Sequence, residues 1–338
     1  MKKQFLFSML LLACLCFYTG QVYNQTILAG VKAGEKWGFI DLTGNWVIQP
    51  QYDNADFFSG GLADVKAGDN WGYIDNTGKW AIEAKFKRAE PFSEGLGRVI
   101  QRDSKDDGWI YLDKTGKQAF QGVFANCFNF HEGMAGARTG KLWGYIDKSG
   151  KFVIPEQLEH AETFFDGIAR VEWGDVYGFI DKSGNWVLKT NLENIRDMKE
   201  GVAPAKGKDG WGYITKEGKI IVPTKNDHAQ PFSEGLGRVR SGKVWGYYDV
   251  AGRLVIPFSF KEALDFSDGL AAAQQNDKWG FINKEGKFVI QPQYDEAGSF
   301  SNGLAAVKSG KLWGFIDKTG KVVIPYKYDD FLPFTKAD

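Results

Sequence analysis

Trp37-Gly38-Phe39-Ile40-Asp41 is the stretch that decides the fold, because close copies of it recur along the whole chain. Successive copies start 34 residues apart, except for one gap of 38 after the second copy. A chain built from nine copies of one unit is expected to fold as a tandem repeat. The copies begin at Trp37, Trp71, Trp109, Trp143, Tyr177, Trp211, Trp245, Trp279 and Trp313.

The composition favours a globular β protein. Charged residues make up 25% of the 338-residue chain and hydrophobic residues 43%, which is typical of a folded rather than a disordered protein. An aromatic content of 15%, together with 42 glycines, favours strands joined by tight turns. The formal net charge is zero, so no basic surplus is available to neutralise phosphates, and nucleic acid is not an expected partner.

Each unit has the pattern of three short strands separated by turns. In the last unit the apolar runs cover 304–307, 313–317 and 321–325, with glycines between them. A helical repeat of the same period is not favoured, because no segment carries the i, i+3, i+4, i+7 spacing of an amphipathic helix. We therefore predict an all-β chain of nine antiparallel β-meander units of about 34 residues. They form one continuous repeat domain over residues 27–335.

The turn after the Trp-Gly motif carries an Asp and, three residues later, a Gly. An Asp side chain accepts hydrogen bonds from backbone N–H groups two residues further on, and the Gly supplies a positive φ. The aspartates are thus predicted to cap turns rather than to act as catalytic carboxylates. Units with both residues include Asp41 and Gly44, Asp75 and Gly78, Asp113 and Gly116, Asp147 and Gly150, Asp181 and Gly184, and Asp317 and Gly320.

The strands are apolar on both sides. In the last unit Trp313 and Phe315 point to one side of the strand and Gly314 points to the other. Such strands lie in sheets that are covered on both faces, and in a tandem array the neighbouring unit supplies the cover. The nine aromatic residues that begin the motif are therefore predicted to form the structural core between units. The adjacent glycine is expected to let a neighbour's ring approach closely.

Stacked units of this kind either spiral openly or close into a ring. Closed propellers usually have about 4–8 blades, so nine units lie outside the common range. The pattern also leaves no strand over at one end to complete a unit begun at the other. We therefore expect an open, curved solenoid in preference to a closed, propeller-like ring.

The N-terminus is typical of an export signal. Lys2 and Lys3 precede an apolar run over residues 5–17, which is too short to span a bilayer as a mature helix. We predict a signal peptide over residues 1–20 and an exported protein that is periplasmic, outer-membrane-associated or secreted. Two alternatives remain open: lipidation of Cys14 within a lipoprotein-like box, or an uncleaved anchor.

Four side chains stand out as candidates for a partner or ligand surface. Arg98, Arg170 and Arg238 share one slot of the first strand in the third, fifth and seventh units. They form either a cationic stripe for an acidic polymer or a partner's carboxylate, or scattered solvated charges. Trp173 occupies a turn tip where other units have small or polar residues. It either stacks on a sugar or anchors a partner, or it covers the unit in which Tyr177 replaces tryptophan.

No residue set predicts a metal or a cofactor. A carboxylate precedes the turn glycine in six consecutive units, but packed sheets lie about 10 Å apart. Oxygens that share one Ca²⁺ lie within about 5 Å of each other. Solvated turn residues are therefore the expected role of these carboxylates, and the three histidines show no zinc spacing. The residues concerned are Glu94, Glu132, Asp166, Glu200, Glu234 and Asp268, and the histidines are His131, His160 and His228.

These motifs resemble those of the WG-repeat (KWG) family of bacterial proteins. The resemblance rests on Lys-Trp-Gly-Phe-Ile at 36–40 and 278–282, on Leu-Trp-Gly-Phe-Ile-Asp at 312–317, and on the flanking patterns at 150–155 and 300–305. It covers about residues 27–335. The resemblance implies a β-rich repeat protein that is often exported, and it implies no catalytic residues.

The expected function is therefore non-catalytic. The favoured hypothesis is a binding or scaffolding module of the bacterial cell envelope that uses the extended surface of the stacked units. The alternative is a carbohydrate- or cell-wall-binding module that uses exposed aromatic residues. An enzyme is not expected, because most acidic residues repeat with the period, as turn chemistry predicts and a unique active site does not. The expected partner is thus a protein or an envelope glycan.

Overall fold

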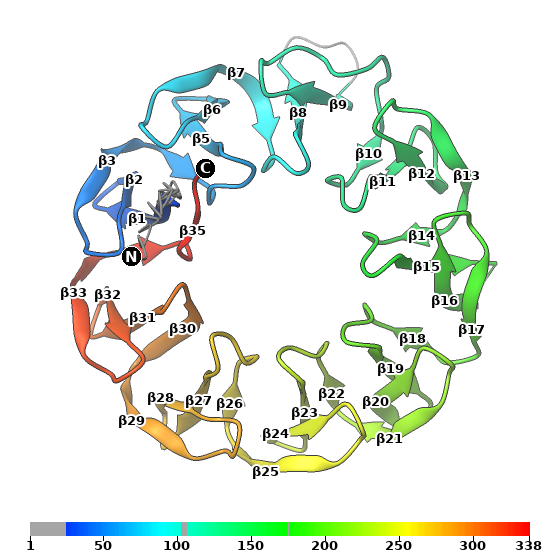
Figure 1. The fold of residues 1–338 in the computed structure, drawn as a ribbon, viewed down its shortest axis with the longest axis vertical. Helices are drawn as coiled ribbons and strands as arrows, with labels where there is room; N and C mark the ends of the chain where they lie inside the picture. Colours follow the sequence, from blue (N-terminus) through cyan, green and yellow to red (C-terminus); the bar gives the residue numbers. More distant parts are fainter. Residues whose placement is uncertain (1–24, 103–106, 175) are drawn as a thin grey trace, which may run out of the picture.

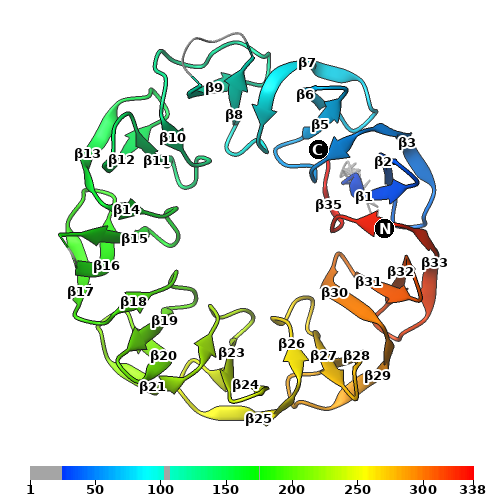
Figure 2. The same ribbon diagram turned by 180° about the vertical axis from the view of Figure 1, so that it is seen from behind.

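The computed structural model describes residues 25–102, 107–174 and 176–338, which form a closed ring of β-sheets (Figure 1, Figure 2). The predicted all-β fold is confirmed for this part of the chain, where no helix is present. Accordingly, no segment of it is a helix long and apolar enough to cross a membrane. The predicted signal segment over residues 1–20, with Cys14, lies outside the described residues.

The strands form eight sheets, so the ring is a β-propeller with eight continuous blades. The strand nearest the centre comes first in a typical sheet, and the last strand lies at the periphery (Figure 1). Six sheets have four strands each. Their strands are β10 (Asn126–Cys127), β11 (Met134–Arg138), β12 (Trp143–Asp147) and β13 (Phe152–Leu158); β14 (His160–Ala161), β15 (Ile168–Trp173), β16 (Val176–Asp181) and β17 (Trp186–Thr190); β18 (Asn194–Ile195), β19 (Val202–Gly207), β20 (Gly210–Thr215) and β21 (Ile220–Asn226); β22 (His228–Ala229), β23 (Leu236–Ser241), β24 (Val244–Asp249) and β25 (Leu254–Phe260); β26 (Glu262–Ala263), β27 (Ala271–Gln275), β28 (Lys278–Ile282) and β29 (Phe288–Tyr294); and β30 (Glu296–Ser301), β31 (Leu304–Ser309), β32 (Leu312–Asp317) and β33 (Val322–Tyr328).

The other two sheets explain how nine repeat units occupy eight blades. One sheet has six strands in the order β4-β5-β6-β7-β8-β9, because β7 is long enough to serve two units. Its strands are β4 (Asn54–Ala55), β5 (Ala63–Ala67), β6 (Asn70–Ile74), β7 (Trp80–Ala89), β8 (Leu96–Gln101) and β9 (Trp109–Asp113). The last sheet joins the two ends of the chain. It contains β1 (Ile27–Ala33), β2 (Lys36–Ile40), β3 (Trp46–Tyr52), β34 (Asp330–Phe331) and β35 (Thr335–Lys336).

The ring is closed by strands that follow the ninth unit, so the predicted open solenoid is wrong. In β34, Phe331 lies opposite Val31 of β1, and β35 pairs with the same strand. The N–H of Leu332 donates to the carbonyl of Gly30 at 2.8 Å. The sequence-based prediction assigns this final segment to the ninth unit. In the structure, such a segment supplies the innermost strand of the following unit, and the last one returns to β1.

The closing junction is packed like the internal ones. At the first turn, a Cβ added to Gly44 would lie 3.1 Å from Cγ2 of Ile324 in the last unit. Between the first two units, a Cβ at Gly78 would lie 3.1 Å from Cγ2 of Ile48. The same glycine–isoleucine contact therefore joins unit nine to unit one and unit one to unit two. The junction between the chain ends is thus a regular member of the ring.

The glycine of the Trp-Gly motif has a different role from the predicted one. A Cβ on Gly38 would lie 2.6 Å from the carbonyl oxygen of Ile48, in the outer strand of the same sheet. The β2–β3 pairing skips residues here, since Trp37 faces Tyr52 while Phe39 faces Ile48. Such a bulge brings the two backbones together. The glycine thus admits its own sheet's third strand rather than a neighbour's ring.

Neighbouring units are joined by a second column of aromatic residues, two positions after the tryptophan. All nine are at most 2% exposed. Tyr247 is typical, since its ring meets Phe266 of the next sheet edge-on with the centroids 5.2 Å apart. Edge-to-face pairs of this kind add stability beyond the apolar area that they bury. The column comprises Phe39, Tyr73, Tyr111, Tyr145, Phe179, Tyr213, Tyr247, Phe281 and Phe315.

The predicted turn aspartates are confirmed. In the first unit the Oδ1 of Asp41 accepts hydrogen bonds from the N–H groups of Thr43 at 2.9 Å and Asn45 at 3.0 Å. Gly44 ends the turn with a φ of +85°. These hydrogen bonds hold the pKa of the Asp41 carboxyl below its usual value, although burial acts in the opposite direction and is the largest single influence. The carboxylates of this column are therefore engaged in holding turns.

Candidate functional site

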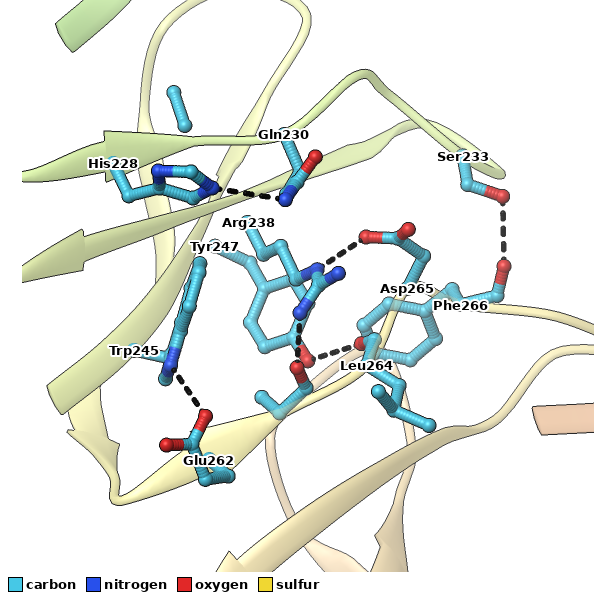
Figure 3. Close-up of polar contacts among 12 residues, drawn as sticks. His228, Gln230, Ser233, Arg238, Trp245, Tyr247, Glu262, Leu264, Asp265 and Phe266 are labelled. Carbon is cyan, nitrogen blue, oxygen red and sulfur yellow. Dashed lines mark hydrogen bonds and ion pairs between the residues drawn. The ribbon is translucent and has the colours of Figure 1, made fainter. Parts of the chain in front are cut away.

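The arginines singled out in the sequence form contacts between sheets. Arg238 lies on β23, and its Nε donates to Oδ1 of Asp265 in the next sheet at 2.6 Å (Figure 3). A second guanidinium N–H donates to the carbonyl of Ala263. The guanidinium carbon lies 4.9 Å from the centre of the Trp245 ring. Only 15% of the Arg238 side chain is exposed, so this charge is already matched within the ring.

The other two predicted arginines bridge sheets in the same direction. A guanidinium N–H of Arg98 donates to the carbonyl of Cys127 on β10, at 2.5 Å. Arg170 pairs with Glu162 at 2.6 Å and reaches Asp197, beyond β18, at 3.5 Å. Their side chains are 15% and 16% exposed. The three arginines are therefore neither a free cationic stripe nor solvated charges.

A fourth arginine of this kind was missed by sequence reasoning. Arg196 donates to the carbonyl of Ala229 on β22 at 3.0 Å and to Oε1 of Gln230, the next residue, at 2.9 Å, both in the next sheet. Its guanidinium lies 4.4 Å from the centre of the Trp211 ring. Arg196 follows β18 rather than lying on the first long strand, so it occupies a different slot of the repeat. No periodic signal in the sequence links it to the other three.

Hydroxyl groups make further contacts between units. The hydroxyl of Tyr247 donates to the carbonyl of Leu264 at 2.7 Å, and Oγ of Ser233 donates to the carbonyl of Phe266 at 2.7 Å (Figure 3). Burial raises the pKa of Tyr247 above its usual value. The phenol therefore stays protonated and keeps its donor role.

The carboxylates before the turn glycines also bind the next unit, in contrast to their predicted solvated role. Glu234 has a φ of +54°, and its carboxylate accepts a hydrogen bond from the N–H of Gly269 at 3.1 Å. This carboxylate is thus held by a backbone N–H group of the following unit. Among the described residues, no group of three or more His, Cys, Asp or Glu side chains could hold a metal ion. The bonded pairs are Glu94 with Gly133, Glu132 with Gly167, Glu200 with Gly235, Glu234 with Gly269, and Asp268 with Gly303.

Asp64 is a buried carboxyl in the slot that holds arginine in three other units. It is 2% exposed, and its Oδ1 is buried without a hydrogen-bond partner. Burial, followed by the nearby carboxylates of Asp56 and Glu90, raises the pKa of Asp64 well above its usual value. A buried carboxyl with a raised pKa therefore occupies this junction.

The tryptophan column that begins the motif lies between units at varying depth. Five members are 5–9% exposed, namely Trp37, Trp109, Trp143, Trp245 and Trp313. The remaining four are partly buried, namely Trp71, Tyr177, Trp211 and Trp279.

Cys127 and the histidines are dispersed. Cys127 is fully buried, and burial raises the pKa of its thiol to about 11, so it has the character of a small core residue. His160 lies 2.8 Å from Glu162, whereas His228 contacts Gln230 at 3.0 Å in another sheet. His131 packs against Phe165 in a third place, with ring centroids 4.3 Å apart.

An open cleft surrounds Trp173. The indole of Trp173 is stacked on that of Trp186, with centroids 5.7 Å apart and an interplanar angle of 19°. The cleft has a volume of about 410 Å³ and is lined by both tryptophans together with Gly174, Val176 and Lys189. The Nζ of Lys189 lies 5.2 Å from the centre of the Trp186 ring. This aromatic cleft is the candidate ligand site of the described residues.

Comparison with solved structures finds one chain of similar fold and several weaker matches. A crystal structure of a eukaryotic initiation factor has a TM-score of 0.67 and 11% identity, and the match covers 92% of this chain and 98% of that chain. Dihydro-heme d1 dehydrogenase NirN matches with a TM-score of 0.48 and 9% identity over 93% of this chain and 75% of that one. Kluyveromyces lactis Hsv2p matches with a TM-score of 0.40 and 8% identity over 83% and 98%. At such low identity, the first likeness supports the fold alone.

Sequence comparison assigns the repeats. The search of curated proteins returned no match to this chain. A family model described as "WG containing repeat" matches nine segments of the chain, which are 37–71, 71–103, 109–143, 143–175, 177–210, 211–244, 245–279, 279–313 and 313–336. These segments cover nearly the whole repeat domain and agree with the spacing of the motif. The chain belongs to the family of WG-containing repeat proteins.

Proposed function

We propose that this protein is a non-catalytic, exported repeat protein that acts as a binding and scaffolding module of the bacterial cell envelope. The observation that carries the proposal is the use of the repeated polar side chains. The turn aspartates, the carboxylates before glycine, the tyrosine hydroxyls and the arginines bond within or between sheets. Groups that would supply acid–base chemistry in an enzyme thus hold the ring together.

A ring held in this way is suited to presenting a surface. Most junctions have an edge-to-face aromatic pair, and some add hydrogen bonds between sheets, as between Tyr247 and the segment Leu264–Phe266 (Figure 3). Pre-organised surfaces lose less conformational entropy when they bind a partner. The hairpin residues can therefore differ from unit to unit while the ring stays fixed. Trp173 in the fifth unit and Lys243 in the seventh are two examples, and each lines an open cleft.

The proposed location rests on the N-terminus. Lys2, Lys3 and the apolar run over 5–17 have the order of an export signal. Cleavage after residue 20 gives a periplasmic or secreted protein, and lipidation of Cys14 gives a membrane-tethered one. Intact-mass measurement of the mature protein distinguishes these two products.

The function is tested by capture of a partner. The full chain, tagged at its C-terminus and produced with its own N-terminal segment, is cross-linked in cells and purified from the envelope fraction. We expect one protein to be enriched reproducibly and to be displaced by an excess of purified untagged chain. A capture that yields no displaceable protein, or a purified chain that turns over envelope glycans, would overturn the proposal.

A carbohydrate-binding role is a second candidate function, and the aromatic cleft favours it. Stacked, partly exposed tryptophans beside a small cleft are suited to the flat face of a sugar ring. This role is compatible with scaffolding, because a protein partner and a glycan can occupy different parts of the ring.

A further inference from the structure

The aromatic cleft exists because the fifth unit departs from the repeat in its third strand. In regular units the second and third strands skip residues, as where Trp279 faces Tyr294 while Phe281 faces Ile290. In the fifth unit β16 and β17 pair residue by residue through this region. As a result Lys189 stands directly opposite Gly178.

This register places the lining residues on one face of the sheet. Trp173 pairs with Val176, and Lys189 pairs with Gly178, two positions further along β16. Residues opposite each other share a face, as do residues two apart on one strand. Gly178 has no side chain, and the indole of Trp186 fills that space, since a Cβ there would lie 2.6 Å from Cζ3 of the ring.

Trp186 is oriented differently from the other tryptophans of its slot. Trp46 meets Tyr328 of the preceding unit edge-on at 5.7 Å and 88°, and Trp80 meets Tyr52 at 5.8 Å and 80°. The unit before Trp186 has Leu158 in the corresponding place and offers no aromatic edge. Trp186 stacks instead on Trp173 of its own sheet. The pair is thus a local feature rather than part of the repeating core.

The cleft is open and has the size of a small-ligand site. Its volume of about 410 Å³ lies within the range of small-molecule clefts, about 300–1,000 Å³. Both indoles are only partly buried, Lys189 is exposed, and no atom lies within 4 Å of a Cβ position at Gly174. A protein partner needs a far larger contact, of about 800 Å² on each side. A short part of a smaller ligand fits the site better.

The charges around the cleft favour a neutral, hydroxyl-rich ligand. Lys189 supplies a cation that lines the cleft. Glu159 supplies a carboxylate at the rim, where its Oε2 accepts a hydrogen bond from the N–H of Gly174 at 2.9 Å. The ammonium group can donate hydrogen bonds to a ligand's hydroxyl groups, and the carboxylate can accept them. The stacked indoles provide flat apolar surface beside these polar groups.

We propose that this cleft binds a neutral sugar residue of a glycan chain, with the sugar ring stacked on the Trp173–Trp186 pair and its hydroxyls directed to Lys189 and the Glu159 carboxylate. The proposal rests on the carbohydrate-binding form of the proposed function and names its site. The C–H face of a pyranose matches the indoles, and its hydroxyls both donate and accept hydrogen bonds. The ring separation of 5.7 Å leaves no room for a sugar between the indoles, so the sugar takes an outward-facing surface.

The test uses the full chain and defined oligosaccharides. An array of neutral and acidic oligosaccharides is screened first, and binding is then measured by calorimetry with chitotetraose, cellotetraose and mannotetraose, with tetragalacturonate as the charged control. Trp173→Ala removes one indole and is expected to weaken binding about tenfold or more, because stacking and the apolar contact are both lost. Trp173→Phe keeps a flat ring and should restore part of the affinity.

A matched control comes from the seventh unit. Ser241 pairs with Val244 at the hairpin position that Trp173 and Val176 occupy in the fifth unit. Ser241→Ala should therefore leave glycan binding unchanged, and Lys189→Ala should weaken it without altering the thermal midpoint. Together these variants separate loss of the site from loss of the fold.

Three results would overturn the sugar site: no neutral oligosaccharide bound by the wild-type chain, equal binding by Trp173→Ala, or binding of tetragalacturonate alone. Failure of the two proposals is distinguishable. Capture of an envelope protein without any glycan binding refutes the sugar site and leaves the scaffolding role standing. Glycan binding lost in Trp173→Ala, without partner capture, supports the sugar site and refutes the scaffolding role.

Discussion

Replacing Phe334 with alanine tests whether the ring is closed in solution. The Phe334 side chain is 1% exposed, and its ring meets Phe315 edge-on with centroids 5.2 Å apart. Its carbonyl also accepts a hydrogen bond from Oγ of Ser301 at 2.8 Å, which the substitution leaves in place. Truncation of a buried phenylalanine to alanine costs about 3–5 kcal/mol. We expect Phe334→Ala to lose that much stability, although it lies only four residues from the C-terminus.

The matched control is Phe300→Ala, at the equivalent position of an internal junction. Phe300 is also 1% exposed, and its ring lies 4.8 Å from that of Phe281. Urea unfolding followed by tryptophan fluorescence compares the two variants on one denaturant scale. Because long repeat arrays need not unfold in one step, hydrogen exchange at β1 supplies a local measurement.

A closed ring predicts similar losses for both variants and faster exchange at β1 in Phe334→Ala. An open ring predicts that the terminal segment is already detached. In that case Phe334→Ala would lie within about 1 kcal/mol of wild type while Phe300→Ala lost the full amount. That outcome would refute the closure inferred from β34 and β35.

The remaining predictions concern single junctions and one buried acid. Trp245 is 5% exposed, so Trp245→Ala should lower the free energy of unfolding in urea by about 3–5 kcal/mol. Trp173 is partly exposed, so Trp173→Ala should lower it by less than about 1 kcal/mol. Equal, small losses in the two variants would contradict the burial argument. Arg238→Ala removes the hydrogen bonds of the guanidinium to the next sheet, and it should lower the free energy of unfolding by about 1.5–3 kcal/mol. Arg238→Lys should restore little of this loss, because lysine lacks the planar, forked guanidinium. Full restoration by lysine would refute a role for the guanidinium geometry. Asp64 has a raised pKa in the folded state, so its carboxyl binds protons more tightly in the folded chain than in the unfolded one. The stability that this protonation supplies is complete below about pH 4, and it declines as the pH rises toward the folded pKa. Asp64→Asn should therefore gain stability relative to wild type as the pH of thermal unfolding is raised from 4 to 8, and a constant difference would contradict the raised pKa of Asp64.

The repeat made the local structure predictable. Each Trp-Gly motif lies on a second strand, and Asp41 with its equivalents caps the following turn, because both features depend on residues only a few positions apart. The candidate cleft was partly predictable in the same way. Trp173 stood out at a turn tip, but nothing in the sequence pointed to Trp186 as its partner. Only the register of β16 and β17 brings the two indoles together.

The contacts between sheets were less predictable. Arg98, Arg170 and Arg238 were recognised as sharing a slot, yet the sequence does not show that the slot faces carbonyl and carboxylate groups of the next sheet. Arg196 lies outside that slot and reaches the same kind of acceptor. Pairing between sheets depends on the rotation from one unit to the next, which residue spacing does not report.

The sequence by itself determined that the chain consists of nine β units of one pattern, since strand length, turn chemistry and apolar alternation are all local properties. Tertiary structure alone decided that the units close into a ring, that the last strands complete the first sheet, and that one long strand merges two units into a single blade. The physical reason is that closure depends on a small rotation at each junction, added over the whole array. That rotation arises from packing between neighbours, such as the Gly44–Ile324 contact that joins the two ends.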